Sequence, residues 1–184
     1  AADPLTHVVH GYHPYWISDA AADAYRWDLL SHLAYFSYEV DAASGEPLTV
    51  RDWRTSTVID RAKTEGVKVL LTVTNFGAAN NRTFLSSAQA RNILITRVIA
   101  LLQERGAHGV NIDFEALSGD QRENLVSFFT ELRGRLDAAI TDAVISVAAP
   151  AVDWDGAWDV AALAPSIDLF FVMCYDYSWS SSSE

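Results

Sequence analysis

Short apolar runs alternate with longer amphipathic stretches along this sequence. The apolar runs are rich in β-branched and aromatic residues, which predicts strands. They lie at residues 8–12, 30–40, 67–73, 109–115, 144–147 and 167–177. Between them, apolar residues recur at helical spacing at 57–65, at 87–105 and from residue 120 onward, and a shorter helix is expected at 157–163. Strands separated by helices are typical of βαβ units in a parallel sheet.

Local residues predict where these helices begin and end. Ser87 can cap the second helix and Gly106 follows its end, while Gly66 follows the first helix in the same way. Asp120, with Glu123 three residues later, forms a capping-box pattern for the third helix. The residues expected to face inward are Ile93, Leu94, Val98, Leu101 and Leu102 in the second helix and Leu125, Phe128, Phe129, Leu132 and Leu136 in the third.

The near-continuous apolar character of the strands indicates a sheet that is covered on both faces or closed into a barrel. The pattern by itself leaves two architectures open, a doubly wound sheet and a (β/α) barrel. The sequence contains no internal repeat and no linker-like segment. We therefore expect residues 1–184 to form one α/β unit with no second domain.

The stretch Gly109–Glu115 carries the most distinctive polar pattern. Because side chains alternate along a strand, Asn111, Asp113 and Glu115 are predicted to share one face. The residues between them are apolar and are expected to face the covering helices. Two acids and an amide thus line up towards the carboxyl end of a buried strand, where parallel-sheet enzymes place their chemistry.

Burial and a neighbouring carboxylate both disfavour ionisation, so either Asp113 or Glu115 is expected to hold a proton near neutral pH. A protonated carboxylic acid is what the leaving oxygen of a glycosidic bond requires. The alternatives are a stabilising polar row, or an α/β protein in which Asn111, Asp113 and Glu115 bind Mg²⁺ or Ca²⁺. Three polar residues in register opposite a purely apolar face favour catalysis.

The stretch 108–115, His-Gly-Val-Asn-Ile-Asp-Phe-Glu, resembles the Asp-Gly-x-Asp-x-Asp-x-Glu strand of glycoside hydrolase family 18. That family contains chitinases, endo-β-N-acetylglucosaminidases and related cell-wall hydrolases. Gly109, Asp113 and Glu115 match the motif, whereas His108 and Asn111 replace its first two aspartates. The Asn form with Phe before Glu is similar to the bacterial branch that attacks peptidoglycan or spore cortex.

Three further stretches add to the resemblance. Residues 173–176, Met-Cys-Tyr-Asp, resemble the Met-x-Tyr-Asp motif of the family's sixth strand. Gly11 and Tyr12 resemble the Gly-Tyr that ends its first strand. Residues 72–75, Thr-Val-Thr-Asn, stand where the family's third strand usually reads Ser-x-Gly-Gly, and they depart from it after the first position.

The resemblance implies a (β/α)₈ TIM barrel, of which this chain supplies only the first six βα units. We therefore expect residues 1–184 to be a truncated catalytic barrel that lacks the seventh and eighth strands and the tryptophan of the eighth. The expected length of the full fold is about 250 residues. By itself, the 184-residue chain is expected to show little or no activity.

The resemblance also implies a retaining mechanism in which the acetamido oxygen of the substrate attacks the anomeric carbon. Glu115 would protonate the leaving oxygen, Asp113 would hydrogen-bond the acetamido N–H, and Tyr175 would orient the acetamido oxygen. Asn111 would lie below Asp113 and offer it an amide hydrogen bond, and Asp176 would help to hold the sugar. The candidate substrate-binding residues are Asn111, Asp176, Tyr12, Met173, Thr72 and Trp16. No cofactor and no metal are implied.

Charge and composition narrow the class of partner. Half of the residues are hydrophobic, and the formal net charge is −11. This acidity argues against nucleic acid and anionic membrane surfaces, whereas an uncharged polysaccharide fits it. No apolar run reaches the ~20 residues of a membrane span. The start of the chain, Ala-Ala-Asp-Pro, resembles what remains after cleavage at a small-residue site, which indicates a secreted or cell-wall-associated protein.

Two other residue sets were considered for chemistry. His7, His10 and His13 suggest a metal cluster, but a spacing of three residues alternates faces on a strand, so we expect no metal there. Cys174 has no second cysteine to pair with and is expected to be a small buried hydrophobic residue.

The sequence therefore predicts hydrolysis of β-1,4 glycosidic bonds in polymers that contain N-acetylglucosamine, such as chitin or peptidoglycan. The alternative is a catalytically silent, carbohydrate-binding, chitinase-like protein. Silent relatives usually lose the terminal glutamate of the motif, and Glu115 is present, which favours the enzyme.

Overall fold

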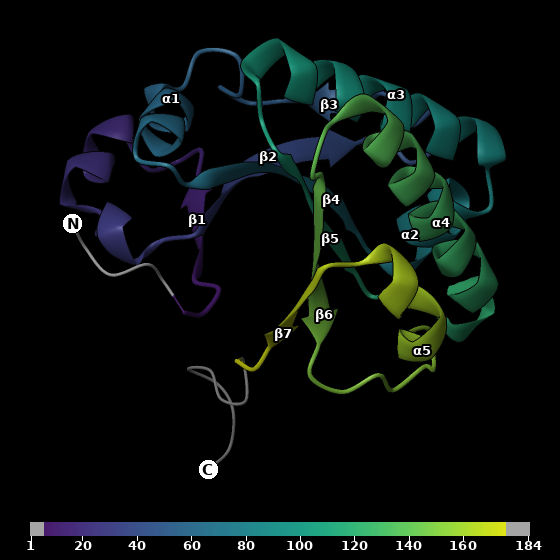
Figure 1. Cartoon of the computed structure of the whole chain (residues 1–184). Helices are drawn as coiled ribbons and strands as arrows, with labels where there is room; N and C mark the ends of the chain where they lie inside the picture. Colours follow the sequence, from purple (N-terminus) through teal and green to yellow (C-terminus); the bar gives the residue numbers. More distant parts are fainter. Residues whose placement is uncertain (1–5, 176–184) are drawn as a thin grey trace.

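The computed structural model describes residues 6–175, and its strands form one curved sheet (Figure 1). Six strands run parallel in the order β1-β2-β4-β5-β6-β7, and β3 pairs antiparallel with β2. The strands are β1 (His10–Pro14), β2 (His32–Val40), β3 (Pro47–Thr49), β4 (Lys68–Phe76), β5 (Gly109–Glu115), β6 (Val144–Pro150) and β7 (Leu169–Met173). The predicted parallel α/β architecture is therefore confirmed.

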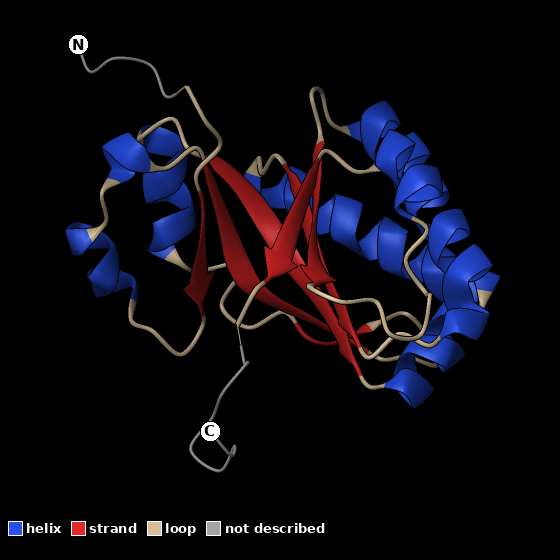
Figure 2. Cartoon of the chain, turned by 90° about the horizontal axis from the view of Figure 1, so that it is seen from below, coloured by secondary structure: helices blue, strands red, loops and turns tan. Residues whose placement is uncertain are grey.

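The helices lie around the outside of this sheet, as Figure 2 shows. The α-helices are α1 (Thr57–Thr64), α2 (Ala78–Leu85), α3 (Ala88–Arg105), α4 (Arg122–Ala139) and α5 (Val160–Leu163). The 3₁₀-helices are η1 (Asp19–Ala24), η2 (Trp27–Leu29), η3 (Gly119–Gln121) and η4 (Ala164–Ser166). Within residues 6–175, no helix combines the length and the apolar character needed to cross a bilayer.

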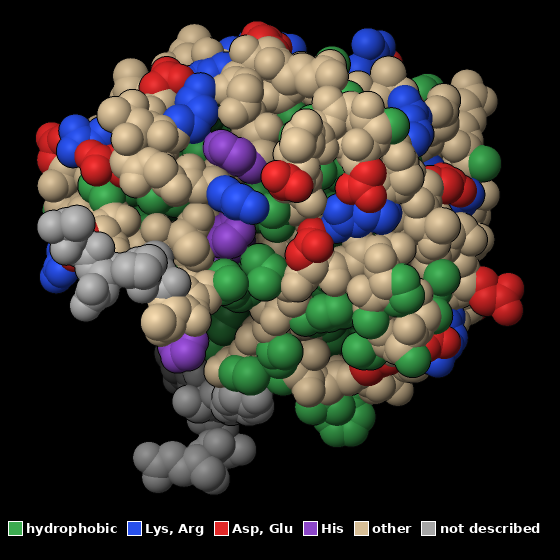
Figure 3. All heavy atoms as spheres, in the orientation of Figure 1, with side chains coloured by type: hydrophobic (Ala, Val, Ile, Leu, Met, Phe, Trp, Pro, Cys, Tyr) green, Lys and Arg blue, Asp and Glu red, His purple; other side chains and the backbone are tan. Residues whose placement is uncertain are grey.

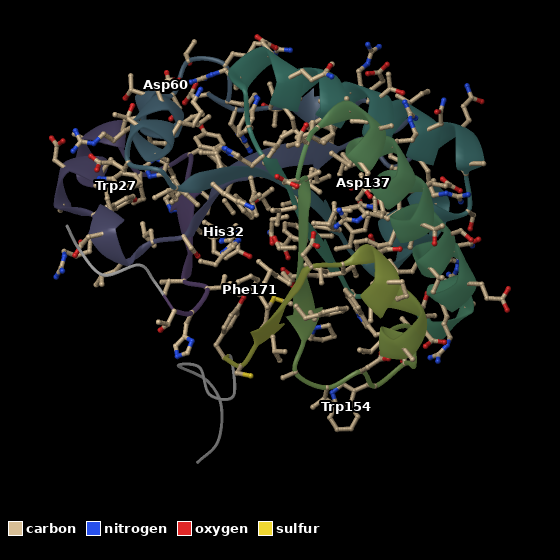
Figure 4. All side chains as sticks on the ribbon, viewed as in Figure 1. Trp27, His32, Asp60, Asp137, Trp154 and Phe171 are labelled. Carbon is tan, nitrogen blue, oxygen red and sulfur yellow. The ribbon has the colours of Figure 1, made fainter. Side chains whose placement is uncertain are left out.

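The sheet curves so strongly that its two outer strands approach each other across its inner side. The ring of His10 on β1 lies with its centroid 4.1 Å from that of Phe171 on β7 and 6.4 Å from that of His32 on β2. Figure 4 labels His32 and Phe171 in this inner region. The six parallel strands thus form an arc of a barrel rather than a flat, doubly wound sheet.

The main hydrophobic core lies between the outer face of the sheet and the helices. On β5, Val110, Ile112 and Phe114 are at most 2% exposed and belong to this core. The ring of Phe114 packs against Phe84 of α2 and Phe128 of α4, each with centroids 5.6 Å apart. This confirms that the apolar positions of β5 face the helices, so its polar positions are left to the inner side.

The predicted ends of α3 and α1 are observed. The Ser87 hydroxyl accepts a hydrogen bond from the Ala90 amide at 3.2 Å. Gly106 ends α3 in a left-handed conformation with φ 58°, and Gly66 follows α1 with φ 76°. The inward face of α3 includes Ile95 in place of the predicted Ile93, which is only partly buried.

The capping box predicted for the third long helix is wrong. A short 3₁₀-helix precedes α4, so the helix begins at Arg122, after the expected cap. The Asp120 carboxylate instead accepts hydrogen bonds from Arg82 at 2.8 Å and from Ser118 at 2.7 Å. Asp120, which the sequence pattern assigned to the helix cap, therefore forms a salt bridge with Arg82 of α2 instead.

The carboxyl end of the last strand also differs from the prediction. β7 ends at Met173 rather than continuing to residue 177, and the side chain of Cys174 is exposed rather than buried. β7 is the outermost strand of the described sheet, so the residues that follow it have no strand on one side to cover them. The outermost position agrees with the expected absence of a seventh and an eighth barrel strand, whereas the early end of β7 was not predicted.

Candidate active site

A hollow of about 350 Å³ opens on the inner side of the sheet, and five of the predicted site residues line it. They come from three places: β1 and the turn that follows it, the second half of β5, and the last residue of β7 with the segment that follows it. The lining residues are Tyr12, Pro14, Trp16, Phe36, Asp113, Ala148, Phe171, Val172, Met173 and Tyr175. The fold thus brings together residues that lie more than 150 positions apart.

Asp113 is the buried acid of this hollow. Asp113 is 8% exposed, and its Oδ1 atom has no hydrogen-bond partner among the described residues. Burial, followed by the charge of Glu115, raises the pKa of Asp113 to about 7. This shift has the direction that the sequence pattern predicts for one acid of the pair.

Glu115 occupies the exposed end of β5. The chain turns immediately after it, because Ala116 adopts a left-handed φ of 61°. The backbone carbonyl of Glu115 is fixed by two donors, the Gly77 amide at 3.1 Å and the Asn81 side-chain amide at 2.6 Å. These contacts come from the start of α2, a helix that the sequence analysis did not predict.

Asn111 lies one step deeper than Asp113 on the same face of β5, and it is fully buried. Its Oδ1 atom accepts hydrogen bonds from the Ser146 hydroxyl at 2.8 Å and from the Tyr12 hydroxyl at 3.3 Å. The expected amide hydrogen bond to Asp113 is not formed, because the Asn111 Nδ2 atom has no partner among residues 6–175. Asn111 therefore holds its neighbours on β1 and β6 in place instead of holding Asp113.

Tyr12 is a neutral hydrogen-bond donor at physiological pH. Burial, followed by the charge of Asp113, raises the pKa of Tyr12 to about 12. Its hydroxyl group donates to Asn111, so the phenol ring is oriented along the wall of the hollow. Tyr175 follows the end of β7, lines the same hollow and is 64% exposed.

Thr72 does not line the hollow, although it was a candidate for binding the sugar. On β4 it lies opposite Asn111, and Thr74 lies opposite Asp113. Thr72 is fully buried, and its hydroxyl oxygen has no hydrogen-bond partner among the described residues. It therefore belongs to the layer beneath the site. Asp176, the other candidate from the last motif, lies outside the described residues.

A second hollow, of about 220 Å³, lies next to the first and contains Glu115. Met173 lines both hollows, so they meet at the end of β7. The remaining residues of the second hollow are Phe114, Ala116, Leu117, Pro150, Val152, Asp153, Trp154, Asp155 and Trp158. Asp113 therefore lines the first hollow, and Glu115 lines the second hollow beside it.

The site includes several residues that sequence reasoning did not identify. Ser146 holds Asn111, Asn81 holds the backbone at Glu115, and Phe171 contributes an apolar wall. Phe171 precedes Met173 and Tyr175 by steps of two, so strand alternation carried a signal for it. The other two depend on register between strands and on α2, for which the sequence carries no local signal.

The histidines near the start of the chain do not converge on one point. His10 contacts Phe171 on the inner side of the sheet. His13 contacts the Tyr25 hydroxyl at 2.8 Å and lies 3.5 Å from the Asp19 carboxylate. Nowhere between residues 6 and 175 do three or more His, Cys, Asp or Glu side chains gather in a way that could hold a metal ion.

Solved structures of known proteins share this fold. The Bacillus cereus spore cortex-lytic enzyme SleL aligns with a TM-score of 0.78 and 21% identity over 94% of this chain and 43% of that chain. A GH18 chitinase from Cycas revoluta, solved in complex with (GlcNAc)₃, aligns with a TM-score of 0.76 and 23% identity over 92% of this chain and 55% of that chain. The six parallel strands and their helices therefore match the first six βα units of a (β/α)₈ barrel, as predicted.

Sequence comparison agrees with the fold. The chain is 27% identical over 158 residues to the cortical fragment-lytic enzyme of Bacillus cereus, covering 82% of this chain. The chain spans only 36 or 37% of the length of the first curated relatives that it matches. The family model of glycosyl hydrolases family 18 matches residues 6–183. This match over nearly the whole chain shows that the chain belongs to glycosyl hydrolase family 18.

Proposed function

We propose that this protein hydrolyses β-1,4 glycosidic bonds in polymers that contain N-acetylglucosamine, with retention of configuration and with the substrate's own acetamido group as nucleophile. The observation that carries the proposal is the arrangement of β5. The buried Asp113 carboxyl group, whose Oδ1 atom has no hydrogen-bond partner within residues 6–175, faces a sugar-sized hollow, and Glu115 lies one step further along the same face.

The unpartnered Oδ1 atom of Asp113 supports an acetamido-bearing substrate. Buried polar atoms without a hydrogen-bond partner are rare in folded proteins and call for an explanation. An acetamido N–H group in the first hollow would supply the missing donor to this oxygen. A sugar that carries a hydroxyl group in place of the acetamido group would provide no nucleophile for the next step.

Glu115 acts in this mechanism as the acid and then as the base. It takes up the proton that Asp113 holds before the reaction and donates it to the glycosidic oxygen while the acetamido oxygen attacks the anomeric carbon. The bond between that carbon and the glycosidic oxygen breaks, the leaving group departs as an alcohol, and a cyclic oxazolinium ion remains. Asp113 is ionised once its proton has passed to Glu115, and its negative charge stabilises the positive charge of this ion. Glu115 then removes a proton from the water that attacks the anomeric carbon, and the bond between that carbon and the acetamido oxygen breaks, which frees the acetamido group. Return of the proton from Glu115 to Asp113 restores the starting protonation state.

The remaining residues position the sugar. The Tyr175 hydroxyl group donates to the acetamido oxygen and directs it towards the anomeric carbon. Tyr12, Trp16 and Met173 line the hollow and offer apolar and aromatic surface to the sugar ring. In the proposed reaction the substrate's acetamido group supplies the nucleophile, and these side chains position the sugar and move the protons.

Chitin and peptidoglycan both contain the required sugar. The relative from Bacillus cereus is named a cortical fragment-lytic enzyme, which is compatible with a peptidoglycan substrate for this protein too. Both polymers lie outside the cytoplasm, so a secreted or cell-wall-associated location accords with the proposed activity.

The test is cleavage of chitooligosaccharides and peptidoglycan by the full-length protein and by Glu115→Gln. We expect the wild type to release reducing ends from at least one of them and the variant to lose the activity. Binding without turnover by the wild type would instead indicate a silent carbohydrate-binding protein. Equal rates for the two proteins would remove Glu115 from the mechanism.

A further inference from the structure

The strand that carries both acids is supported unevenly along its length. β5 pairs with β4 as far as Glu115, which lies opposite Phe76, whereas its pairing with β6 covers Gly109–Ile112. From there β6 continues beside β7, and hydrophobic side chains gather over the region of β6, β7 and α5 (Figure 3). Asp113, Phe114 and Glu115 therefore belong to an end of β5 whose pairing within the sheet is with β4.

The separation of β5 and β6 makes room for the second hollow. This hollow contains Phe114 and Glu115 from the end of β5 and Pro150 from the end of β6. Continued pairing of the two strands would bring them to about 4.8 Å from each other and close this space. The separation that opens the hollow therefore also removes part of the sheet pairing that would hold Glu115 in place.

α2 supplies the hydrogen bonds that anchor this end of the strand. Gly77 follows β4 with a φ of 93°, which glycine adopts readily, and it turns the chain into α2. The Gly77 amide donates to the Glu115 carbonyl oxygen at 3.1 Å, and the Asn81 side-chain amide donates to the same oxygen at 2.6 Å. Ala116, directly after this carbonyl group, has a left-handed φ of 61°, which is unfavourable for alanine. The two donors thus hold the backbone at an unfavourable turn.

Asn81 carries an amide in a position that otherwise favours an apolar side chain. It is fully buried, and its Oδ1 atom has no hydrogen-bond partner within residues 6–175. Because a buried polar atom without a partner destabilises the fold, an apolar side chain of similar shape would be at least as stable there. Asn81 lines neither hollow, so contact with the sugar does not account for it. The bond that its side chain does make is to the backbone of Glu115.

We propose that Asn81 is a positioning residue for Glu115: its amide fixes the end of β5 and so keeps the Glu115 carboxyl group in the second hollow, one step along the strand from Asp113. This role rests on the proposed function, because Glu115 is the acid of that mechanism. The direction of the Glu115 side chain follows from the backbone at this residue, so release of the strand end displaces the carboxyl group. A displacement of about 1 Å at a reacting group lowers a rate by up to about 100-fold.

The experiment measures kcat and KM on chitooligosaccharide, together with the midpoint of urea denaturation, in the full-length wild type and Asn81→Ala. The substitution removes the unpartnered oxygen along with the donor and favours the helix, so the midpoint should stay close to the wild-type value. We expect kcat to fall about 10- to 100-fold and KM to change by less than about two-fold, because Asn81 lines neither hollow. A fall in kcat that is matched by a fall in the midpoint would mean that Asn81 serves folding instead.

A second variant and a control make the result specific to the donor. Asn81→Leu keeps the branched shape of the side chain and adds volume where alanine removes it, so the two variants share only the loss of the donor and should lose kcat alike. Asn80→Ala is the matched control, because the exposed Asn80 makes the same kind of bond one residue away, to the Phe76 carbonyl at 3.0 Å. Its kcat should equal that of the wild type. An unchanged kcat in a folded Asn81 variant, or equal losses at positions 80 and 81, would overturn the proposal.

Crystal structures of the full-length wild type and Asn81→Ala separate this role from the proposed function. In the variant, the carbonyl and carboxyl groups of Glu115 should move relative to Asp113 by about 1 Å, whatever glycan the wild type cleaves. A displaced Glu115 in a protein that hydrolyses no glycan would retain the positioning role and reject the proposed function. A Glu115 side chain that stays in place would reject the positioning role.

Discussion

The surroundings of Asp113 strongly oppose its charged form. It is buried, its Oδ1 atom has no partner among the described residues, and the Glu115 carboxylate stands two positions away on the same face of β5. These conditions keep a proton on Asp113 until about pH 7 in the folded protein. In the unfolded chain the same group loses its proton near its ordinary value of 3.8, so folding carries a cost that depends on pH.

The sign of this cost follows from the raised pKa. Below about pH 4 both states are protonated and the cost is absent. Between pH 4 and pH 7 only the unfolded state ionises, so the free energy of unfolding falls as the pH rises, by on the order of 4 kcal/mol in total. The Asp113→Asn variant lacks this titrating group. The difference between its free energy of unfolding and that of the wild type should therefore rise between pH 4 and pH 7 and then stay constant. Urea denaturation of both proteins at pH 4, 5.5 and 8 measures this difference in the free energy of unfolding. A difference that does not change with pH would contradict a raised pKa of Asp113.

Glu115 is expected to matter for rate and not for stability, because it lies at the exposed end of β5. Glu115→Gln should lower kcat on chitooligosaccharide about 10²- to 10⁴-fold, the range that general acid–base catalysis supplies. The free energy of unfolding of the variant should stay within about 0.5 kcal/mol of the wild-type value. Glu104→Gln is the control, since Glu104 is an exposed partner of Arg54 on the outside of the sheet. A similar loss of kcat in both variants would contradict a specific role for Glu115.

At this scale, strand alternation was enough to predict that Asn111, Asp113 and Glu115 share a face. The alternation did not predict their hydrogen bonds. Asn111 turned out to bond to Tyr12 and Ser146, because those contacts depend on which strands lie on either side of β5. The register between neighbouring strands decides which side chains meet across a sheet. The sequence of a single strand does not determine that register.

The elements are positioned by a few close backbone approaches, of which the start of β5 is the tightest. A Cβ atom at Gly109 would lie 1.9 Å from the carbonyl oxygen of Val144 on β6. Only a glycine lets the two strands come together at this point. The pairing of β5 with β6 in turn places Asn111 opposite Ser146, so the site depends on this contact.

Gly109→Ala and Gly134→Ala form a matched pair of substitutions with opposite expected signs. Gly109→Ala forces β5 and β6 apart and should lower the free energy of unfolding by more than about 2 kcal/mol. At Gly134, in the exposed face of α4, an added Cβ meets nothing within 4 Å, so alanine should stabilise the helix by about 0.5–1 kcal/mol. Thermal or urea denaturation measures both. A neutral Gly109→Ala would show that the strands tolerate separation.

The elements that the sequence did not predict have weak local signals. α2 (AANNRTFL) has polar residues through its centre and lacks an apolar stripe, yet Phe84 and Leu85 at its end are buried against the core. β3 has three residues and pairs with the last two residues of β2, Glu39 and Val40. By contrast, the five predicted inward residues of α4 are all buried, because an amphipathic helix that packs on a sheet shows a clear period.

The molecule as a whole is acidic, with a formal net charge of −11. Long-range repulsion should slow its association with anionic glycans and leave neutral ones unaffected. Such repulsion acts over about 10 Å at 0.1 M salt and is largely screened above that concentration.

Salt should therefore separate the two substrate classes. As NaCl rises from 0.05 to 0.5 M, kcat/KM should increase several-fold for peptidoglycan fragments that carry peptide carboxylates. It should stay constant for chitooligosaccharides of the same length, which serve as the neutral control. Rates measured by release of reducing ends test this, and a decrease for the anionic substrate would show that a cationic surface binds it.

The proposed function requires an acetamido group of the substrate to lie between Asp113 and Tyr175, next to Glu115. A crystal structure of the full-length Glu115→Gln variant with a bound chitooligosaccharide tests it most directly. The acetamido nitrogen of the sugar in the first hollow should lie within hydrogen-bond distance of an Asp113 oxygen, about 2.7–3.2 Å. An acetamido group that points away from Asp113, or a sugar bound with its linkage remote from residue 115, would contradict it.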